Sequence, residues 1–162
     1  MNLMGVDLGI HKVSCAVYRD GGLVQASTHP ASDLEGRGRQ LRELGRYCYD
    51  LGLSHDLDHV WIEDVIIGNN RKYSLQLAQT LGAVLCYLAG LPGVDVRTVD
   101  NKAWKKALLG NGNAAKEQIR DYIHVSHPQY APFCDGDQDR YDATCVGLYG
   151  LRILDRASSL HL

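Results

Sequence analysis

The chain has 162 residues, of which 45% are hydrophobic and 22% are charged, and its formal net charge is −2. This length and composition are typical of a soluble globular protein with a core of its own. They argue against a membrane protein, because the longest apolar-rich stretch, residues 75–91, is interrupted by glutamine, threonine and glycine and predicts a buried helix. No signal peptide is apparent, and the five cysteines form no CxxC pair. We therefore expect one domain, residues 1–162, in the reducing cytoplasm, without structural zinc.

Three short apolar segments at the start of the chain predict an antiparallel meander. The predicted strands cover residues 3–9, 13–18 and 23–28, which are rich in β-formers. Asp20-Gly21-Gly22 is a turn signal between the second and third strands. Connections as short as these join antiparallel neighbours.

The rest of the chain alternates between helix and strand. The predicted order is a helix from Ser32 or Asp33 to about Leu51, a strand at 60–63, a helix at 74–89, a strand at 94–99, helical pieces at 102–108 and 114–125, a loop at 127–137 and a helix at 139–154. Alternation of this kind implies parallel crossovers. We predict an α/β fold, a five-stranded mixed sheet with three antiparallel and then two parallel strands, flanked by helices.

Four acidic residues lie where these elements end or begin. Asp7 ends the first apolar run and Glu63 ends the run Val60-Trp61-Ile62. Asp139 and Asp142 are three apart at the start of the last helix, so they share a helical face. Carboxylates at the ends of buried strands are costly unless they are paired or bound to metal, and four together repel one another. The pattern favours a site for hard divalent cations that cuts or transfers phosphodiesters with two metal ions.

Two other readings of the acids stay open. Each acid taken alone is better explained as a strand-end or helix-capping residue, whereas the order and context of all four favour the metal site. Asp135 and Asp137 directly precede the last pair, so either could replace Asp139 as a ligand. The spacing of three on a helix favours Asp139 and Asp142.

The distribution of basic residues qualifies the negative net charge. If the four acids bind metal, 15 other acids face 17 lysines and arginines, a balance of +2. The basic residues gather at 37–46 and at 102–120. Within the second group, the turn Gly110-Asn111-Gly112 precedes a helix that carries Lys116 early. Backbone amides and a helix start favour a phosphate, and Lys116 would lie beside it.

These motifs resemble the RuvC-type Holliday junction resolvases of the ribonuclease H-like nucleases, along nearly the whole chain. The matching segments are Gly5-Val6-Asp7-Leu8-Gly9, Trp61-Ile62-Glu63-Asp64-Val65, residues 75–82, residues 104–119 and Asp139-Arg140-Tyr141-Asp142-Ala143. The resemblance implies that Asp7, Glu63, Asp139 and Asp142 bind two Mg²⁺ ions, with Mn²⁺ as a substitute. It implies a catalytic role for Lys116 as well, and a homodimer that nicks two strands of a four-way junction. We expect DNA contacts from Lys105, Lys106, Lys116, Arg71, Lys72 and Tyr73.

The chain departs from the family pattern beside two of the acids. Residues 8–12, LGIHK, follow Asp7 where Pro-Gly-Ser is common, and His11 is a candidate phosphate contact. Ile66 and Ile67 stand where an aromatic that wedges into the junction is expected, and Tyr73 is a candidate replacement.

The helix predicted at 74–89 is apolar around more of its circumference than one buried face needs. It is either deeply buried or part of a subunit interface, and the resemblance to a dimeric family favours the interface.

The leading interpretation is a crossover junction endodeoxyribonuclease that leaves 5′-phosphate and 3′-hydroxyl ends. The alternatives are a RuvC-like catalytic domain of a transposase-type strand-transfer enzyme and a non-catalytic DNA-binding protein of the same fold. An actin-like nucleotide-binding module would need two such domains, and the chain has about half that length.

Overall fold

The computed structural model describes residues 1–32, 36–65 and 67–159. The strands are β1 (Asn2–Leu8), β2 (Lys12–Arg19), β3 (Gly22–Pro30), β4 (His59–Glu63) and β5 (Asp95–Val99). The helices are α1 (Arg37–Ser54), α2 (Arg71–Leu88), α3 (Asn101–Leu109), α4 (Lys116–Ser126), α5 (Ala131–Cys134) and α6 (Gln138–Ser159), with a 3-10 turn at Pro128–Tyr130.

The described strands form one five-stranded sheet in the order β3-β2-β1-β4-β5. β1, β2 and β3 pair antiparallel, whereas β4 pairs parallel with both β1 and β5. The predicted fold class is therefore confirmed. The parallel pairs follow from the crossovers through α1 and α2, which return the chain to the same edge before each new strand begins.

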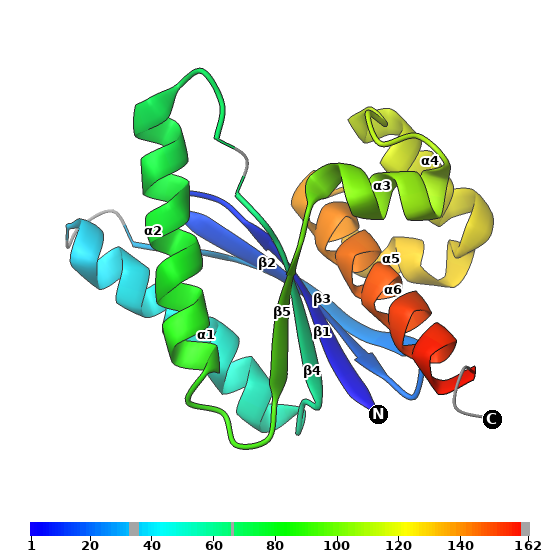
Figure 1. The fold of residues 1–162 in the computed structure, drawn as a ribbon, viewed down its shortest axis with the longest axis horizontal. Helices are drawn as coiled ribbons and strands as arrows, with labels where there is room; N and C mark the ends of the chain where they lie inside the picture. The colour runs from blue at the N-terminus through cyan, green and yellow to red at the C-terminus, as the bar shows by residue number, and fades with distance from the viewer. Residues whose placement is uncertain (33–35, 66, 160–162) are drawn as a thin grey trace.

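Helices cover both faces of the sheet, α1 and α2 on one side and α3 to α6 on the other (Figure 1). β1 serves both cores, because successive side chains of a strand point to opposite faces. Leu3 packs with Trp61 and Trp104 beneath α6, whereas Met4 and Val6 pack beneath α1 and α2. β1 is thus a central, fully covered strand.

Glycines bring α6 unusually close to β1. A Cβ on Gly5 would lie 2.3 Å from the carbonyl oxygen of Ala143 and 2.3 Å from the amide nitrogen of Gly147. The Tyr18 hydroxyl on β2 donates to the carbonyl oxygen of Thr144 at 2.7 Å. This contact places the first turns of α6 beside the end of β1, where Asp7 lies.

Two helix starts differ from the prediction. α1 begins at Arg37 after Gly36, which has φ 76° and gives no side-chain cap. Ser32 is not the cap, because its amide and hydroxyl both donate to the carboxylate of Glu43, and Asp33 lies outside the described residues. α2 begins at Arg71, three residues earlier than predicted, because the side chain of Asn70 accepts from the amide of Tyr73.

The C-terminal part of the chain is more helical than predicted. The expected loop at 127–137 contains a 3-10 turn and α5, and α6 continues past Leu154 to Ser159.

Arg37 is a structural residue rather than a free member of a basic patch. Its guanidinium donates to the carbonyl oxygens of Ile10 and Gln76 and to the Thr80 hydroxyl at 2.9 Å. It therefore ties the turn after β1 to α1 and α2.

Over the described ranges, no helix is long and apolar enough to cross a membrane.

Candidate functional site

A cavity of about 260 Å³ lies at the edge of the sheet where β1 and β4 end. These strands are parallel, so their carboxyl ends meet there. The cavity is lined by Asp7, Glu63, Asp139 and Asp142, with the last two on the first turns of α6. The other lining residues are Leu8, Gly9, Lys12, Ser14, Tyr73, Leu77 and Lys116. The four acids singled out in the sequence thus share one cavity.

Asp7 is strongly disfavoured as an anion. Burial raises its pKa well above the usual value, and the charges of Glu63, Asp142 and Asp139 raise it further, whereas Lys12 acts in the opposite direction. A cluster of this kind is stabilised by protons or by cations.

Glu63 is held in place by two donors from α3. Asn101 Nδ2 donates to Oε1 at 2.5 Å and the buried Trp104 indole donates to Oε2 at 3.0 Å. Burial raises the pKa of Glu63, although both hydrogen bonds lower it. Asp100 caps α3 by accepting from the Ala103 amide, which fixes the start of the helix that carries both donors.

The two acids on α6 have different partners. Burial raises the pKa of Asp142 to about 6, while a hydrogen bond from Gln138 Nε2 at 3.0 Å lowers it. Asp139 makes an ion pair with Lys12, the first residue of β2. Lys12 is the clearest feature that the sequence reasoning missed.

Asp137 and Asp135 occupy structural positions outside the cavity lining. Asp137 accepts from the Thr28 hydroxyl at 2.8 Å and from the Asp139 amide at 2.9 Å, so it fixes the start of α6. Asp135 is exposed, has φ 48° and ends α5. The geometry therefore favours Asp139 over either neighbour as the cavity residue.

The donor set fits a hard divalent cation, because four carboxylates face one cavity and burial raises the pKa of at least three of them. As the side chains stand, however, no group of three or more His, Cys, Asp or Glu within the described part of the chain is arranged to hold a metal ion. Three of the four carboxylates instead contact other side chains. Asn101 donates to Glu63, Gln138 donates to Asp142, and Lys12 forms an ion pair with Asp139. Metal binding would require these carboxylates to turn toward one another.

The predicted DNA-contact residues surround the cavity unequally. Lys116, at the start of α4, and Tyr73, on the first turn of α2, line it. Lys105 is partly buried, with its ammonium 5.4 Å from the centre of the Trp104 ring, and its charge lowers the pKa of both Glu63 and Asp142.

The other three predicted contacts lie outside the cavity lining. Arg71 and Lys72 are exposed on the first turn of α2, and Lys106 is exposed on α3. His11 is exposed and also lies outside the lining. Ile67 is 84% exposed, and Ile66 lies outside the described residues.

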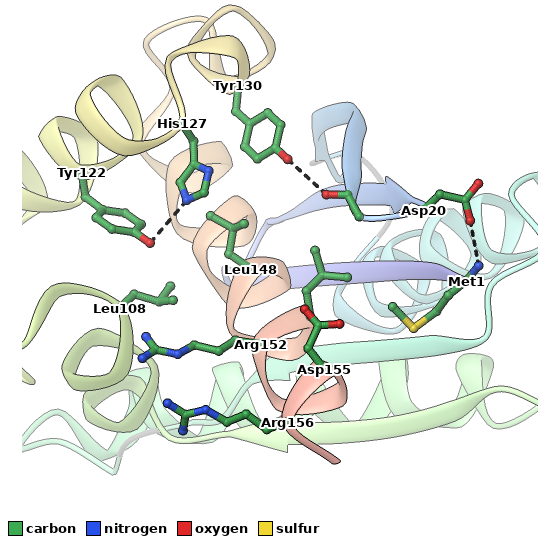
Figure 2. A pocket seen from close by; sticks show the side chains of 12 residues that line it. Met1, Asp20, Leu108, Tyr122, His127, Tyr130, Leu148, Arg152, Asp155 and Arg156 are labelled. Atoms are coloured by element: carbon green, nitrogen blue, oxygen red, sulfur yellow. Dashed lines mark hydrogen bonds and ion pairs between the residues drawn. The ribbon is translucent and has the colours of Figure 1, made fainter. Parts of the chain in front are cut away.

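A larger cavity, of about 650 Å³, lies near the amino terminus and the carboxyl-terminal half of α6 (Figure 2). Its polar groups pair largely with the protein itself. The Tyr122 hydroxyl and His127 Nε2 lie 3.4 Å apart, and the Tyr130 hydroxyl donates to the Gly21 carbonyl oxygen. Arg152 donates to the carbonyl oxygen of Ala107. Because no cluster of acids lines this cavity, the smaller one is the better candidate for chemistry.

The raised pKa of Asp142 predicts a pH-dependent cost in the metal-free protein. A raised carboxyl pKa stabilises the fold below the unfolded value, near 4, and this stabilisation is lost as pH rises through about 6. Asn does not titrate, so wild type should lose stability relative to Asp142→Asn by on the order of 2 kcal/mol between pH 3.5 and 7.5, after allowance for solvent screening. Urea unfolding of both proteins in EDTA measures the difference, and a pH-independent difference would contradict the assignment.

Comparison with known proteins agrees with this fold. A family model described as crossover junction endodeoxyribonuclease RuvC matches residues 3–126. The protein of that name from Ehrlichia chaffeensis is 27% identical over 152 residues, covering 91% of this chain and 94% of its own. Its counterpart from Bdellovibrio bacteriovorus is 28% identical over 127 residues, covering 76% and 75%.

Solved structures share the fold. Thermus thermophilus RuvC in complex with Holliday junction substrate has a TM-score of 0.76 and 22% identity, covering 92% of both chains. A fowlpox virus resolvase bound to Holliday junction DNA has a TM-score of 0.58 and 13% identity, covering 95% of this chain and 99% of that one. The family-model match includes Asp7, Glu63 and Lys116 and ends before α6.

Proposed function

The chain belongs to the RuvC family of crossover junction endodeoxyribonucleases, and on that premise we propose that it is a divalent-cation-dependent endonuclease that resolves Holliday junctions by paired, symmetric nicks. The products would carry 5′-phosphate and 3′-hydroxyl ends. The observation that carries the proposal is the convergence of four acids from β1, β4 and α6 on one cavity. We also propose a cytoplasmic location, because the five cysteines are free thiols, the state that a reducing compartment maintains.

Mg²⁺ is the proposed cofactor, with two ions held by Asp7, Glu63, Asp139 and Asp142 and with Mn²⁺ able to replace them. When bound, such ions activate water and stabilise the charge on the leaving oxygen. Asn101 and Trp104 hold both oxygens of Glu63 in the metal-free protein, so this carboxylate would have to turn from at least one of these donors to take an ion. Lys116 would hold a phosphate oxygen at the mouth of the cavity.

The test compares synthetic four-way, three-way, flap and linear duplex DNA as substrates. The four-way junction should be cut in Mg²⁺ by two symmetric nicks, and it should be bound but not cut in Ca²⁺. Strand transfer to a second duplex would instead favour the transposase-type alternative. Binding without cleavage in either metal would favour a non-catalytic protein.

Lys116→Ala should lower the turnover of junction cleavage by about 100-fold, because a charge beside the reacting phosphate acts mainly in the transition state. Lys105→Ala should have a smaller effect, since that ammonium rests on the Trp104 ring and acts on the acids from a distance. Lys102→Ala, on the exposed side of α3, is the matched control and should cut normally. Single-turnover cleavage measures all three, and normal turnover by Lys116→Ala would show that the DNA is placed wrongly.

We propose further that two copies associate through α2. Leu75 is 63% exposed on this helix, and it lines an apolar cavity of about 380 Å³ together with Val65, Ile67 and Ala78. Paired nicks need two sites related by a twofold axis, and a self-complementary patch supplies such an interface. An exposed apolar patch on α2 suits this role better than a charged, solvated helix face.

Leu75→Asp should convert the dimer to a monomer without unfolding it, because the side chain is exposed within one protomer. Leu81 and Leu85 are poorer test positions than the sequence suggested, since both pack against the core beneath α1 and α2. Val125→Asp, at an 81% exposed position on α4, is the control. Sedimentation at micromolar concentration measures the change, and a wild-type monomer that still makes paired nicks would contradict the proposal.

A further inference from the structure

Lys12 brings a fixed positive charge into the acid cavity. It lines the cavity and makes an ion pair with Asp139, with side-chain exposures of 50% and 21%. Within the described ranges, no such ion pair joins Lys105 or Lys116 to any of the four acids. Lys12 therefore differs from Lys105 and Lys116, the two lysines for which we expect contacts to DNA.

The turn that carries Lys12 is held from three directions. The Gly9 amide donates to the Lys12 carbonyl oxygen at 2.9 Å, and the Ala31 amide donates to the His11 carbonyl oxygen at 2.8 Å. Arg37 donates to the Ile10 carbonyl oxygen. A Cβ on residue 9 would lie 3.0 Å from Lys12 Cγ, so glycine leaves space for the lysine stem to run beside the turn. The backbone at Lys12 is thus held by hydrogen bonds, and only its side chain can change position.

The ammonium faces more than one acid. Asp139 contacts it, and the charges of Asp137 and Asp7 also act on it. A cation placed among carboxylates relieves their mutual repulsion, as a bound metal ion would. A divalent cation on the Asp139 oxygen that contacts Lys12 would lie beside the ammonium, and the two positive charges would repel each other.

We propose that Lys12 is the resident counter-ion of the acid cluster, which holds Asp139 in the metal-free protein and competes with the divalent cation for that carboxylate. This inference rests on the proposed function, because it takes Asp139 to be a metal ligand. It deepens that function by making metal loading an exchange of one cation for another. Because the metal must displace Lys12, a higher metal concentration is needed to fill the site. When metal is scarce, the ammonium offsets the repulsion among the carboxylates and so stabilises the folded protein.

The test is calorimetric titration of the full-length protein with Ca²⁺, which avoids turnover. Lys12→Met keeps the length of the side chain and removes the charge, and Lys102→Met removes one charge outside the cavity. Lys12→Met should bind Ca²⁺ about threefold to tenfold more tightly than wild type, as the loss of one partly exposed opposing pair implies. Lys102→Met should stay within about twofold of wild type, and Lys12→Arg should not bind Ca²⁺ more tightly than wild type, because the positive charge remains.

A second readout does not depend on affinity. In EDTA, Lys12→Met should unfold at a lower temperature than wild type, because the four carboxylates lose their counter-ion, and excess Ca²⁺ should abolish that deficit. A lysine with only a structural role would give a deficit that metal leaves unchanged.

The outcomes separate the inference from the function it rests on. If wild type binds Ca²⁺ and Lys12→Met binds it no more tightly than Lys102→Met, the counter-ion role is overturned while the proposed function stands. If wild type binds no divalent cation at millimolar concentration, both are overturned. Tighter binding by Lys12→Met, together with a deficit that metal removes, supports the exchange.

Discussion

The Asp7→Asn variant should bind a four-way junction and leave it uncut. With Asp7 as one of the proposed metal ligands, its loss would remove several kcal/mol of transition-state stabilisation, so cleavage should fall by about 1,000-fold or more. Junction binding should persist, because the lysines and Tyr73 around the cavity are unchanged. Gel-shift binding in Ca²⁺ and single-turnover cleavage in Mg²⁺ measure the two properties separately.

The same variant should be more stable than wild type when metal is absent. Burial and three neighbouring acids raise the pKa of Asp7, so ionisation at neutral pH costs the folded state free energy that the neutral amide does not cost. Asp121→Asn, at an exposed position on α4, is the control and should change neither cleavage nor stability. Near-normal cleavage by purified Asp7→Asn would remove Asp7 from the reaction.

Gly5→Ala should destabilise the protein by about 3 kcal/mol or more, although it adds only one methyl group. That methyl group would lie 2.3 Å from backbone atoms of Ala143 and Gly147, and neither can rotate away as a side chain could. α6 would have to move off β1, and Asp139 and Asp142 would move with it. Urea unfolding measures the stability. Cleavage should also fall under conditions well below the unfolding transition, because Asp139 and Asp142 would be displaced in the folded protein.

Gly38→Ala is the matched control for this substitution. A Cβ on Gly38 meets nothing within 4 Å, and the residue lies in the first turn of α1. Alanine there should be neutral or slightly stabilising, because it favours helix without a steric penalty. Equal stability of Gly5→Ala and Gly38→Ala would show that β1 and α6 do not pack as described.

The mixed sheet and the convergence of the four acids could be predicted because each follows from a local pattern. Asp7 and Glu63 end apolar runs, and parallel strands align their ends, so the two acids had to meet once the crossover was recognised. Asp139 and Asp142 joined them because a spacing of three fixes a common helical face. Their roles as metal ligands remain predictions.

What could not be predicted depends on contacts between distant residues. Asn101 and Trp104 reach Glu63 across 38 and 41 positions, and no periodicity encodes such a pairing. Ser32 is a good capping residue by type, yet its hydrogen bonds to Glu43 take it away from the helix start. In the segment after Asp7, the sequence suggested His11 as a phosphate contact. The strand register pairs Asp7 with Ser14, so Lys12, two residues before Ser14, lies on the same face as Asp7 and reaches Asp139.

The dependence of the site on α6 also sets the order in which it can appear during synthesis. Domains emerge from the ribosome amino terminus first, and the sheet strands β1 to β5 are complete by residue 99. The hydrogen bond from Tyr18 to the carbonyl oxygen of Thr144, 126 positions later, can form only after α6 has been synthesised. A nascent chain that ends before residue 139 therefore carries only Asp7 and Glu63 of the four acids, so it has neither their full mutual repulsion nor the four-acid cavity until the chain beyond residue 142 has been made.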